Sequence, residues 1–416
     1  MKNFIERDTN MENEKKINRR DLFKGAGVVA ATVLGGSVLK AAEPETEKPQ
    51  EKQEPKFPQV EKRKFGRTDV MVSMLSLGGM IDMKNSHILL KKAIDFGVTY
   101  WDTANGYGNG ASEEGIGEFF KKNPGIREKL FLVTKASGAK TIADVEERLQ
   151  MSLKRMNTKY IDLYYGVHGL SDPANLNDDL KNWAKSAKDR GLIKHFGFST
   201  HSNMADCLSA AAELDWIDGI MTTYNFELLG DEKMQAAIEK CNKKGIALIA
   251  MKTQAKGVDA VQVDATLKKF SEKGFTPEQA KMKIVWEDKR FCAICSQMPN
   301  FTILLSNVAA AMDKTKINPN EALEIKAELQ TNSYCAGCEK ICSQACPDMP
   351  YIRDVMRALM YSNSYGQIDA ARETFNSIPA YARENILSAD YSVAQWKCPR
   401  NLPIANLVQQ AKAMFS

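Results

Sequence analysis

The sequence predicts an α/β protein in which a (β/α)8 TIM barrel is followed by a small, mostly helical C-terminal domain. The chain has 416 residues, and at about 150 residues per domain this leaves room for one large core and an appendage. From Val72 onward, short apolar runs alternate with amphipathic segments, a pattern typical of parallel strands covered by crossover helices. Eight such units over about 250 residues match the size of a closed barrel. The predicted strands are residues 74–77, 100–103, 130–134, 161–165, 195–198, 220–224, 246–250 and 291–295.

Amphipathic helices are predicted between these strands, for example over residues 141–157 and 231–244. In the first of them, apolar side chains recur at helical spacing and form one stripe. A doubly wound sheet is the alternative fold. It would normally carry a Gly-x-Gly-x-x-Gly turn after its first strand, whereas this sequence has Leu77-Gly78-Gly79-Met80 there. The pattern therefore favours the barrel.

Composition narrows the class of protein. Hydrophobic residues make up 44% of the chain and charged residues 26%, which excludes wholesale disorder and a polytopic membrane protein. The net charge is +5, and more than half of it lies in residues 1–42. Nucleic-acid binding is therefore not expected.

The N-terminus is predicted to be an export signal. Arg19 and Arg20 precede an uncharged stretch, residues 25–39, which is too short to span a bilayer comfortably as a helix. This arrangement resembles twin-arginine signals, which implies the export machinery as a partner and a periplasmic or outward-facing, membrane-anchored location. The expected organisation is an export signal over residues 1–42, a Pro-rich charged linker over 43–64, the barrel over 65–316 and a helical domain over 317–416.

Four polar residues follow predicted strands. Asp102 closes the second strand, Tyr107 lies in the loop after it, Lys135 closes the third strand and His168 follows the fourth. Active sites of such barrels lie at the C-terminal ends of the strands, so these side chains are expected to meet.

The sequence here resembles the aldo-keto reductases, over roughly residues 65–312. The resemblance rests on Asp102-Thr103-Ala104, Tyr107-Gly108, Ser112-Glu113 before Ile116-Gly117, Lys135, His168 and Gly197-Phe198-Ser199. It implies that Tyr107, Lys135, Asp102 and His168 are the catalytic residues, that NAD(P)H is the cofactor and that the substrate is a small carbonyl compound or alcohol.

Chemistry explains these residue types. Hydride arriving at a carbonyl carbon leaves negative charge on the oxygen, which must be protonated or hydrogen-bonded. The ammonium of Lys135 is expected to lower the pKa of the Tyr107 phenol towards its working range, while Asp102 holds the lysine. His168 is expected to orient the substrate oxygen.

The resemblance also places the nicotinamide carboxamide at Ser199 and its neighbours. Thr200 stands where asparagine is usual, Met221 beside Tyr224 replaces the usual glutamine, and Met251 replaces the stacking aromatic. Lys252 and Lys256 are candidate pyrophosphate contacts. Residues 296–300 contain no Lys or Arg, so nothing there indicates a preference for NADP.

A cysteine cluster marks the C-terminal domain. Cys335, Cys338, Cys342 and Cys346-Pro347 follow the ferredoxin run with one extra residue, and this predicts a 4Fe-4S cluster in a ferredoxin-like extension. Zinc and two disulfides are the alternatives. Cys398-Pro399 repeats the end of the motif, so either Cys346 or Cys398 is the fourth ligand.

The remaining cysteines are interpreted as core residues. Cys292 and Cys295 lie three apart on a predicted strand and are expected to face opposite ways. Cys207 and Cys241 lie in helical patterns.

The predicted function is carbonyl reduction or alcohol oxidation with an auxiliary cluster. The cluster either stabilises the C-terminal domain or receives electrons from a redox partner. One alternative is an exported iron-sulfur electron-transfer protein whose barrel no longer turns over nicotinamide. Another is a non-catalytic interaction module.

Overall fold

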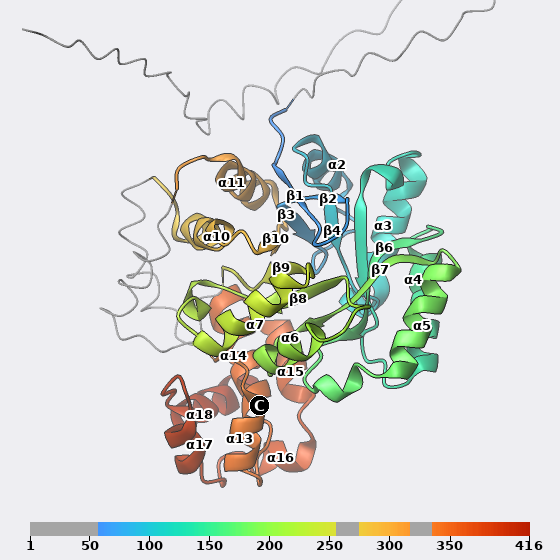
Figure 1. Cartoon of the computed structure of the whole chain (residues 1–416). Helices are drawn as coiled ribbons and strands as arrows, with labels where there is room; N and C mark the ends of the chain where they lie inside the picture. The colour runs from blue at the N-terminus through green and yellow to red at the C-terminus, as the bar shows by residue number, and fades with distance from the viewer. Residues whose placement is uncertain (1–56, 255–273, 317–334) are drawn as a thin grey trace, which may run out of the picture.

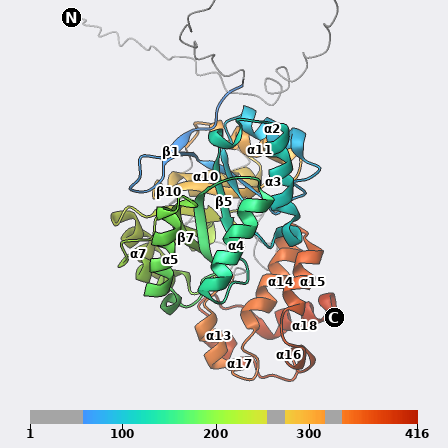
Figure 2. The same cartoon turned by 90° about the vertical axis from the view of Figure 1, so that its right-hand side faces the viewer.

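The computed structural model describes residues 57–254, 274–316 and 335–416. The predicted export signal, most of the predicted linker and Lys256 lie outside these residues. Figures 1 and 2 show a barrel ringed by helices, with a second group of helices gathered at one end of it.

Eight parallel strands close the barrel, in the order β10-β3-β4-β5-β6-β7-β8-β9. The predicted (β/α)8 fold is thus confirmed, and each predicted strand corresponds to one strand of the barrel. The strands are β3 (Leu75–Gly78), β4 (Tyr100–Asp102), β5 (Phe131–Lys135), β6 (Ile161–His168), β7 (Ile193–Thr200), β8 (Gly219–Thr223), β9 (Ala247–Met251) and β10 (Phe291–Gln297).

Side-chain alternation divides the barrel between two cores. In β5, Phe131 and Val133 pack inside the barrel, while Leu132 packs outwards against the helices. Both faces of each strand are therefore apolar, as expected for a parallel sheet that is covered by helices.

A ring of helices covers the outside of the barrel (Figure 1). Polar side chains fix several of their starts: Thr141 forms a capping box with Asp144, and Asp231 accepts a hydrogen bond from the Met234 amide. The helices are α2 (His87–Asp95), α3 (Ala111–Lys122), α4 (Ile142–Arg155), α5 (Asp178–Asp189), α6 (Met204–Ala211), α7 (Glu232–Lys243), α10 (Pro277–Glu287) and α11 (Phe301–Met312).

An antiparallel hairpin precedes the barrel, formed by β1 (Lys62–Lys64) and β2 (Met71–Ser73). Phe65 of this hairpin is fully buried in the interior cluster of the barrel. The sequence predicts an extended linker over residues 43–64, but Val60 is buried and residues 62–64 form β1. The physical reason is that this end of the barrel needs an apolar cover, which the hairpin provides.

Cys292 and Cys295 do not face opposite ways as predicted. The register of β10 shifts between Phe291 and Ala293, which marks an irregularity in the strand. A bulge adds one residue and changes which face the later side chains occupy. Cys292 therefore belongs to the interior cluster and Cys295 packs against the same cluster. Cys207 and Cys241 are buried in the outer core, as predicted.

The C-terminal domain is helical and has a hydrophobic core of its own, which includes Val355, Leu359, Phe375 and Val408. No helix in the described part of the chain is long and apolar enough to cross a membrane. The helices of the domain are α13 (Glu339–Ala345), α14 (Ile352–Tyr365), α15 (Ile368–Asn376), α16 (Ala380–Glu384), α17 (Ser392–Lys397) and α18 (Ile404–Phe415).

Candidate active site

Asp102 and Lys135 form a buried ion pair at the C-terminal ends of β4 and β5. The Lys135 Nζ atom lies 2.5 Å from Asp102 Oδ1 and donates to the Thr103 carbonyl at 2.7 Å. Both side chains are almost completely buried. Burial is the largest single effect and would lower the pKa of Lys135, but the charge and hydrogen bond of Asp102, together with the charges of Tyr107 and Cys295, outweigh it and raise that pKa above its ordinary value. The amine therefore stays an ammonium.

Tyr107 shares this rim of the barrel. The Lys135 Nζ atom lies 4.8 Å from the centroid of the Tyr107 ring. Burial raises the pKa of Tyr107 to about 12, and Lys135 pulls that pKa in the opposite direction. The sequence predicts a net fall of this pKa towards the working range. Lys135 has the expected effect, but desolvation exceeds it, so the phenol keeps its proton at neutral pH.

The loop that carries Tyr107 is held by its backbone conformation and by α4. Gly108 and Asn109 both adopt left-handed conformations, with φ of 57° and 53°, which glycine and asparagine tolerate best. Arg155 donates to the Asn105 carbonyl at 2.9 Å and also contacts buried Glu113 at 3.4 Å. Sequence reasoning missed Arg155, because a basic residue in the last turn of a helix normally signals only a helix end.

His168 ends β6 beside the tyrosine. The two ring centroids are 6.0 Å apart, and the Ser137 hydroxyl lies 2.8 Å from His168 Nδ1. The pKa of His168 is lowered to about 3. Burial is the main cause, and the positive charges of Lys135 and Arg357 add to it. The imidazole is therefore neutral at physiological pH. When Ser137 donates to Nδ1, the Nε2 atom carries the proton and can donate a hydrogen bond.

Some of the predicted cofactor residues lie at the rim of the barrel near His168, whereas the hydroxyls of others are bound elsewhere. Ser199 on β7 pairs in register with His168 on β6 on one side and with Met221 on β8 on the other. Met251 ends β9 and packs against the interior cluster. Lys252 follows it with φ of 57°.

Thr200 and Tyr224 do not offer their hydroxyls to the site. Thr200 Oγ1 donates to the carbonyls of Leu170 and Ser202, at 2.6 and 3.0 Å. The Tyr224 hydroxyl donates to Asp288 at 2.8 Å, and its ring stacks on Phe291 with centroids 4.3 Å apart. The sequence predicts Tyr224 as a cofactor contact, but a residue one position beyond the end of a strand can turn outwards into the helical layer.

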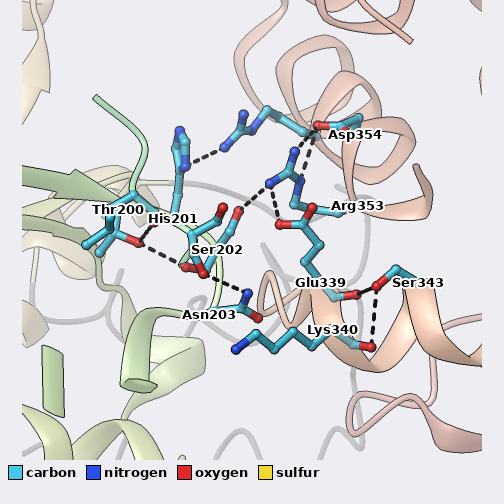
Figure 3. Close-up of polar contacts among 12 residues, drawn as sticks. Thr200, His201, Ser202, Asn203, Glu339, Lys340, Ser343, Arg353 and Asp354 are labelled. Carbon is cyan, nitrogen blue, oxygen red and sulfur yellow. Dashed lines mark hydrogen bonds and ion pairs between the residues drawn. The ribbon is translucent and has the colours of Figure 1, made fainter. Parts of the chain in front are cut away.

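The C-terminal domain reaches the same loops. Figure 3 shows Arg353 between Ser202 of the barrel and the carboxylates of Glu339 and Asp354, with hydrogen bonds of 3.0, 2.7 and 2.7 Å. The Asn203 amide donates to the Gly337 carbonyl at 2.9 Å. The appendage is therefore docked on the loop after β7.

Four cysteines of the C-terminal domain interact with one another. Cys342 is hydrogen-bonded to Cys338, and this bond, then burial, then the charges of Cys335 and Cys398 raise the pKa of Cys342. Cys342, Cys346 and Cys398 all belong to the core of the domain. The pKa of Cys346 is raised first by burial and then by the charges of Asp348 and Asp390, not by another cysteine. All nine cysteines are free, and no group of three or more candidate ligands in the described residues converges on a single metal ion.

Fold and site together define a (β/α)8 barrel with a tyrosine, a lysine, an aspartate and a histidine at one mouth, which is an arrangement suited to proton transfer to and from a carbonyl oxygen. The sequence pattern of the aldo/keto reductase family matches residues 71–297. The chain belongs to the aldo/keto reductase family.

Individual relatives agree with this assignment. The chain is 30% identical over 181 residues to the aldo-keto reductase yakc [NADP(+)] of Schizosaccharomyces pombe, covering 41% of this chain and 52% of that protein. It is 35% identical over 156 residues to the aldo-keto reductase YhdN of Bacillus subtilis, covering 34% of this chain and 45% of that protein. The chain thus spans about half the length of these curated relatives. The holo form of aldo-keto reductase AKR11C1 from Bacillus halodurans shares the fold, with a TM-score of 0.55, 21% identity and coverage of 65% of this chain and 96% of that one.

Proposed function

We propose that the protein is a nicotinamide-dependent oxidoreductase that interconverts a carbonyl compound and an alcohol. The observation that carries this proposal is the meeting of Asp102, Lys135, Tyr107 and His168 at one rim of the barrel. A bound nicotinamide would supply or accept the hydride at the reacting carbon. NADP is named for the yakc relative, which supports NADP(H) as one candidate cofactor.

The residues of the chain would then handle the proton. In the reducing direction, Tyr107 gives its phenolic proton to the carbonyl oxygen as negative charge develops there. Lys135 remains charged through its pair with Asp102 and stabilises the phenolate that is left. Neutral His168 donates a hydrogen bond to the same oxygen and orients it.

Residues along one side of the rim are placed to contact a bound nicotinamide. Ser199, Met221 and Met251 lie on the three strands that follow that of His168 around the barrel, so polar and apolar groups line one side of the rim. A thioether can pack against a ring face, although less specifically than an aromatic ring. We assign the nicotinamide to Ser199, Met221 and Met251.

The function is tested with the full-length protein purified anaerobically. NADPH and NADH binding is measured by fluorescence, and turnover is followed with a panel of aldehydes and ketones. We expect binding of at least one nucleotide and carbonyl-dependent nucleotide oxidation. A wild-type protein that binds neither nucleotide would refute the proposal and would favour the alternative, an iron-sulfur electron-transfer protein with an inactive barrel.

We further propose that Cys335, Cys338, Cys342 and Cys398 bind a 4Fe-4S cluster that stabilises the C-terminal domain. Cys335 and Cys338 precede α13, Cys342 lies in it and Cys398 follows α17. Such thiols do not need to converge on one atom, because a cubane holds its four ligands at separate corners. The charge of Cys398, but not that of Cys346, acts on Cys342, which supports the first of the two ligand sets that the sequence allowed.

Replacing Cys398 by Ser should abolish most cluster loading, while Cys346→Ser should leave it close to the wild-type level. The reason is that Cys398, unlike Cys346, belongs to the proposed ligand set. Iron and acid-labile sulfide are measured per chain, and each variant serves as the control for the other. Loss of iron from Cys346→Ser with retention in Cys398→Ser would reverse the assignment, and equal loading in both would contradict it.

We also propose that residues 1–42 direct export by the twin-arginine route. The paired Arg19 and Arg20 and the short uncharged stretch support this proposal. This route carries folded proteins, which suits a chain that binds its cofactors before export.

A further inference from the structure

Helix α14 presents one polar and aromatic stripe to the barrel. Arg353, Arg357, Tyr361 and Tyr365 follow one another at intervals of four residues, so they share a face of the helix. Tyr361 and Tyr365 pack against the core of the barrel, and Met360 is buried in it. The opposite face of α14 is buried in the core of the C-terminal domain. The helix therefore belongs to both cores, and its position over the barrel is set by packing.

Arg357 lies at the mouth of the barrel. Its guanidinium Nη2 is hydrogen-bonded to His201 Nδ1, directly after the end of β7. Burial and the charge of Arg357 lower the pKa of His201 well below its ordinary value, so the ring is neutral and accepts this bond. The same guanidinium contributes to the low pKa of His168. It therefore lies within electrostatic range of the histidine that is placed to orient the carbonyl oxygen.

Lys252 is a second cation on this side of the mouth. Its Nζ lies 5.1 Å from the centroid of the Tyr361 ring, so the side chain faces α14. Burial, then the charge of Arg357, lowers the pKa of Lys252 well below its ordinary value. Lys252 also has a left-handed backbone conformation, which costs free energy in a residue other than glycine.

Neither basic group forms a salt bridge within the described residues. The carboxylates of Glu339 and Asp354 are both bound by Arg353, at 2.7 Å each. The charge of Asp354 acts on Arg357, and that of Cys335 acts on both Arg357 and Lys252, without a direct ion pair. Partly buried cations without a directly paired anion are destabilised, and an anionic ligand would relieve this.

We propose that Arg357 and Lys252 form a subsite for the carboxylate of the substrate, so that the preferred substrate is a carbonyl compound that also bears an acid group. This inference rests on the proposed function. A planar guanidinium matches a carboxylate geometrically, and its hydrogen bond to His201 places it at the same mouth of the barrel as His168, where the carbonyl is reduced. The C-terminal domain thereby completes the substrate site of the barrel.

The test compares 4-formylbenzoate with its uncharged methyl ester as substrates of the cluster-loaded, full-length protein. We expect wild type to prefer the acid in kcat/KM, and Arg357→Met to reduce the acid-to-ester ratio by about 30-fold or more. Arg357→Lys should restore part of the ratio. Arg372→Met is the matched control, because Arg372 is exposed on α15 and should leave the ratio unchanged.

Three further measurements distinguish a site for the substrate carboxylate from a site for another anion: acid binding, dinucleotide affinity and iron content. Calorimetry with 4-formylbenzoate, without nucleotide, should show binding to wild type that weakens in Arg357→Met. If the protein reduces nothing but this binding difference is found, the proposed function fails while the subsite stands. An unchanged acid-to-ester ratio in Arg357→Met would overturn the subsite, and so would a wild type that neither prefers nor binds the acid. The subsite would also be overturned if Arg357→Met weakened dinucleotide binding instead of acid binding. Loss of iron together with an equal loss of activity on both substrates would overturn it as well. Dinucleotide affinity and iron content are therefore measured on every variant.

Discussion

Replacing Tyr107 by Phe should lower kcat for carbonyl reduction by about 10²- to 10⁴-fold. The phenol keeps its proton at neutral pH because burial raises its pKa to about 12, so the proton is present, and the charge of Lys135 favours its release. Phe preserves the ring that lies over Lys135 and removes only the proton. Nucleotide binding should therefore persist while turnover falls, and the two are measured separately by fluorescence titration and single-turnover kinetics.

The matched control is Tyr160→Phe. Tyr160 immediately precedes β6 and so lies at the opposite end of the barrel strands from the proposed site. Its ring contacts Arg127 and Lys194, contacts that a Phe ring can still make. This variant should turn over like wild type. If Tyr107→Phe were equally active, the proton would have to come from another group and the role assigned to the phenol would be wrong.

Replacing Lys135 by Met should cost about 3–5 kcal/mol of unfolding free energy at neutral pH, in addition to activity. The substitution leaves the carboxylate of Asp102 buried without its cation. Burial already raises the pKa of Asp102 above its ordinary value, and the loss of Lys135, which opposes this, raises it further. Chemical denaturation followed by circular dichroism measures the loss.

The sign of the pH dependence follows from that raised pKa. A carboxyl group that binds its proton more tightly in the folded state stabilises the fold at low pH. This contribution is lost as the pH rises from the unfolded pKa, about 4, to the folded pKa. The deficit of Lys135→Met relative to wild type should therefore be small in acid and grow towards neutral pH.

A second substitution provides the control for this prediction. The double variant Lys135→Met, Asp102→Leu removes both charges and should recover much of the lost stability. It should not recover activity, because Tyr107 would still lack its cation. A deficit that does not vary with pH, or a double variant less stable than Lys135→Met, would show that the ion pair is not the origin of the loss.

Local patterns predicted most of the barrel. The strand positions agree because each strand is short, apolar on both faces and followed by an amphipathic helix, and these are properties of neighbouring residues. The strand-end residues Asp102 and Lys135 were predicted to meet because parallel strands end at a common rim. Their 2.5 Å contact agrees with that expectation.

The failures share a physical cause. A register irregularity turned Cys292 and Cys295 towards the same cluster, and alternation along a strand does not foresee it. The Tyr224 hydroxyl does not face the site, because it donates a hydrogen bond to Asp288, which is 64 residues away in the sequence. The net rise in the pKa of Tyr107 depends on how much water the folded chain excludes, which a motif does not state.

The amino-acid sequence determined that the chain forms a barrel with Asp102, Lys135 and His168 at its strand ends, since apolar periodicity and strand-end residues are encoded over a few neighbouring positions. Only the tertiary structure decided that the charge of Cys398 acts on Cys342 and that α14 brings Arg357 to the mouth of the barrel. Both depend on where the C-terminal domain returns in space, which is set by the packing of surfaces more than a hundred residues apart in the sequence.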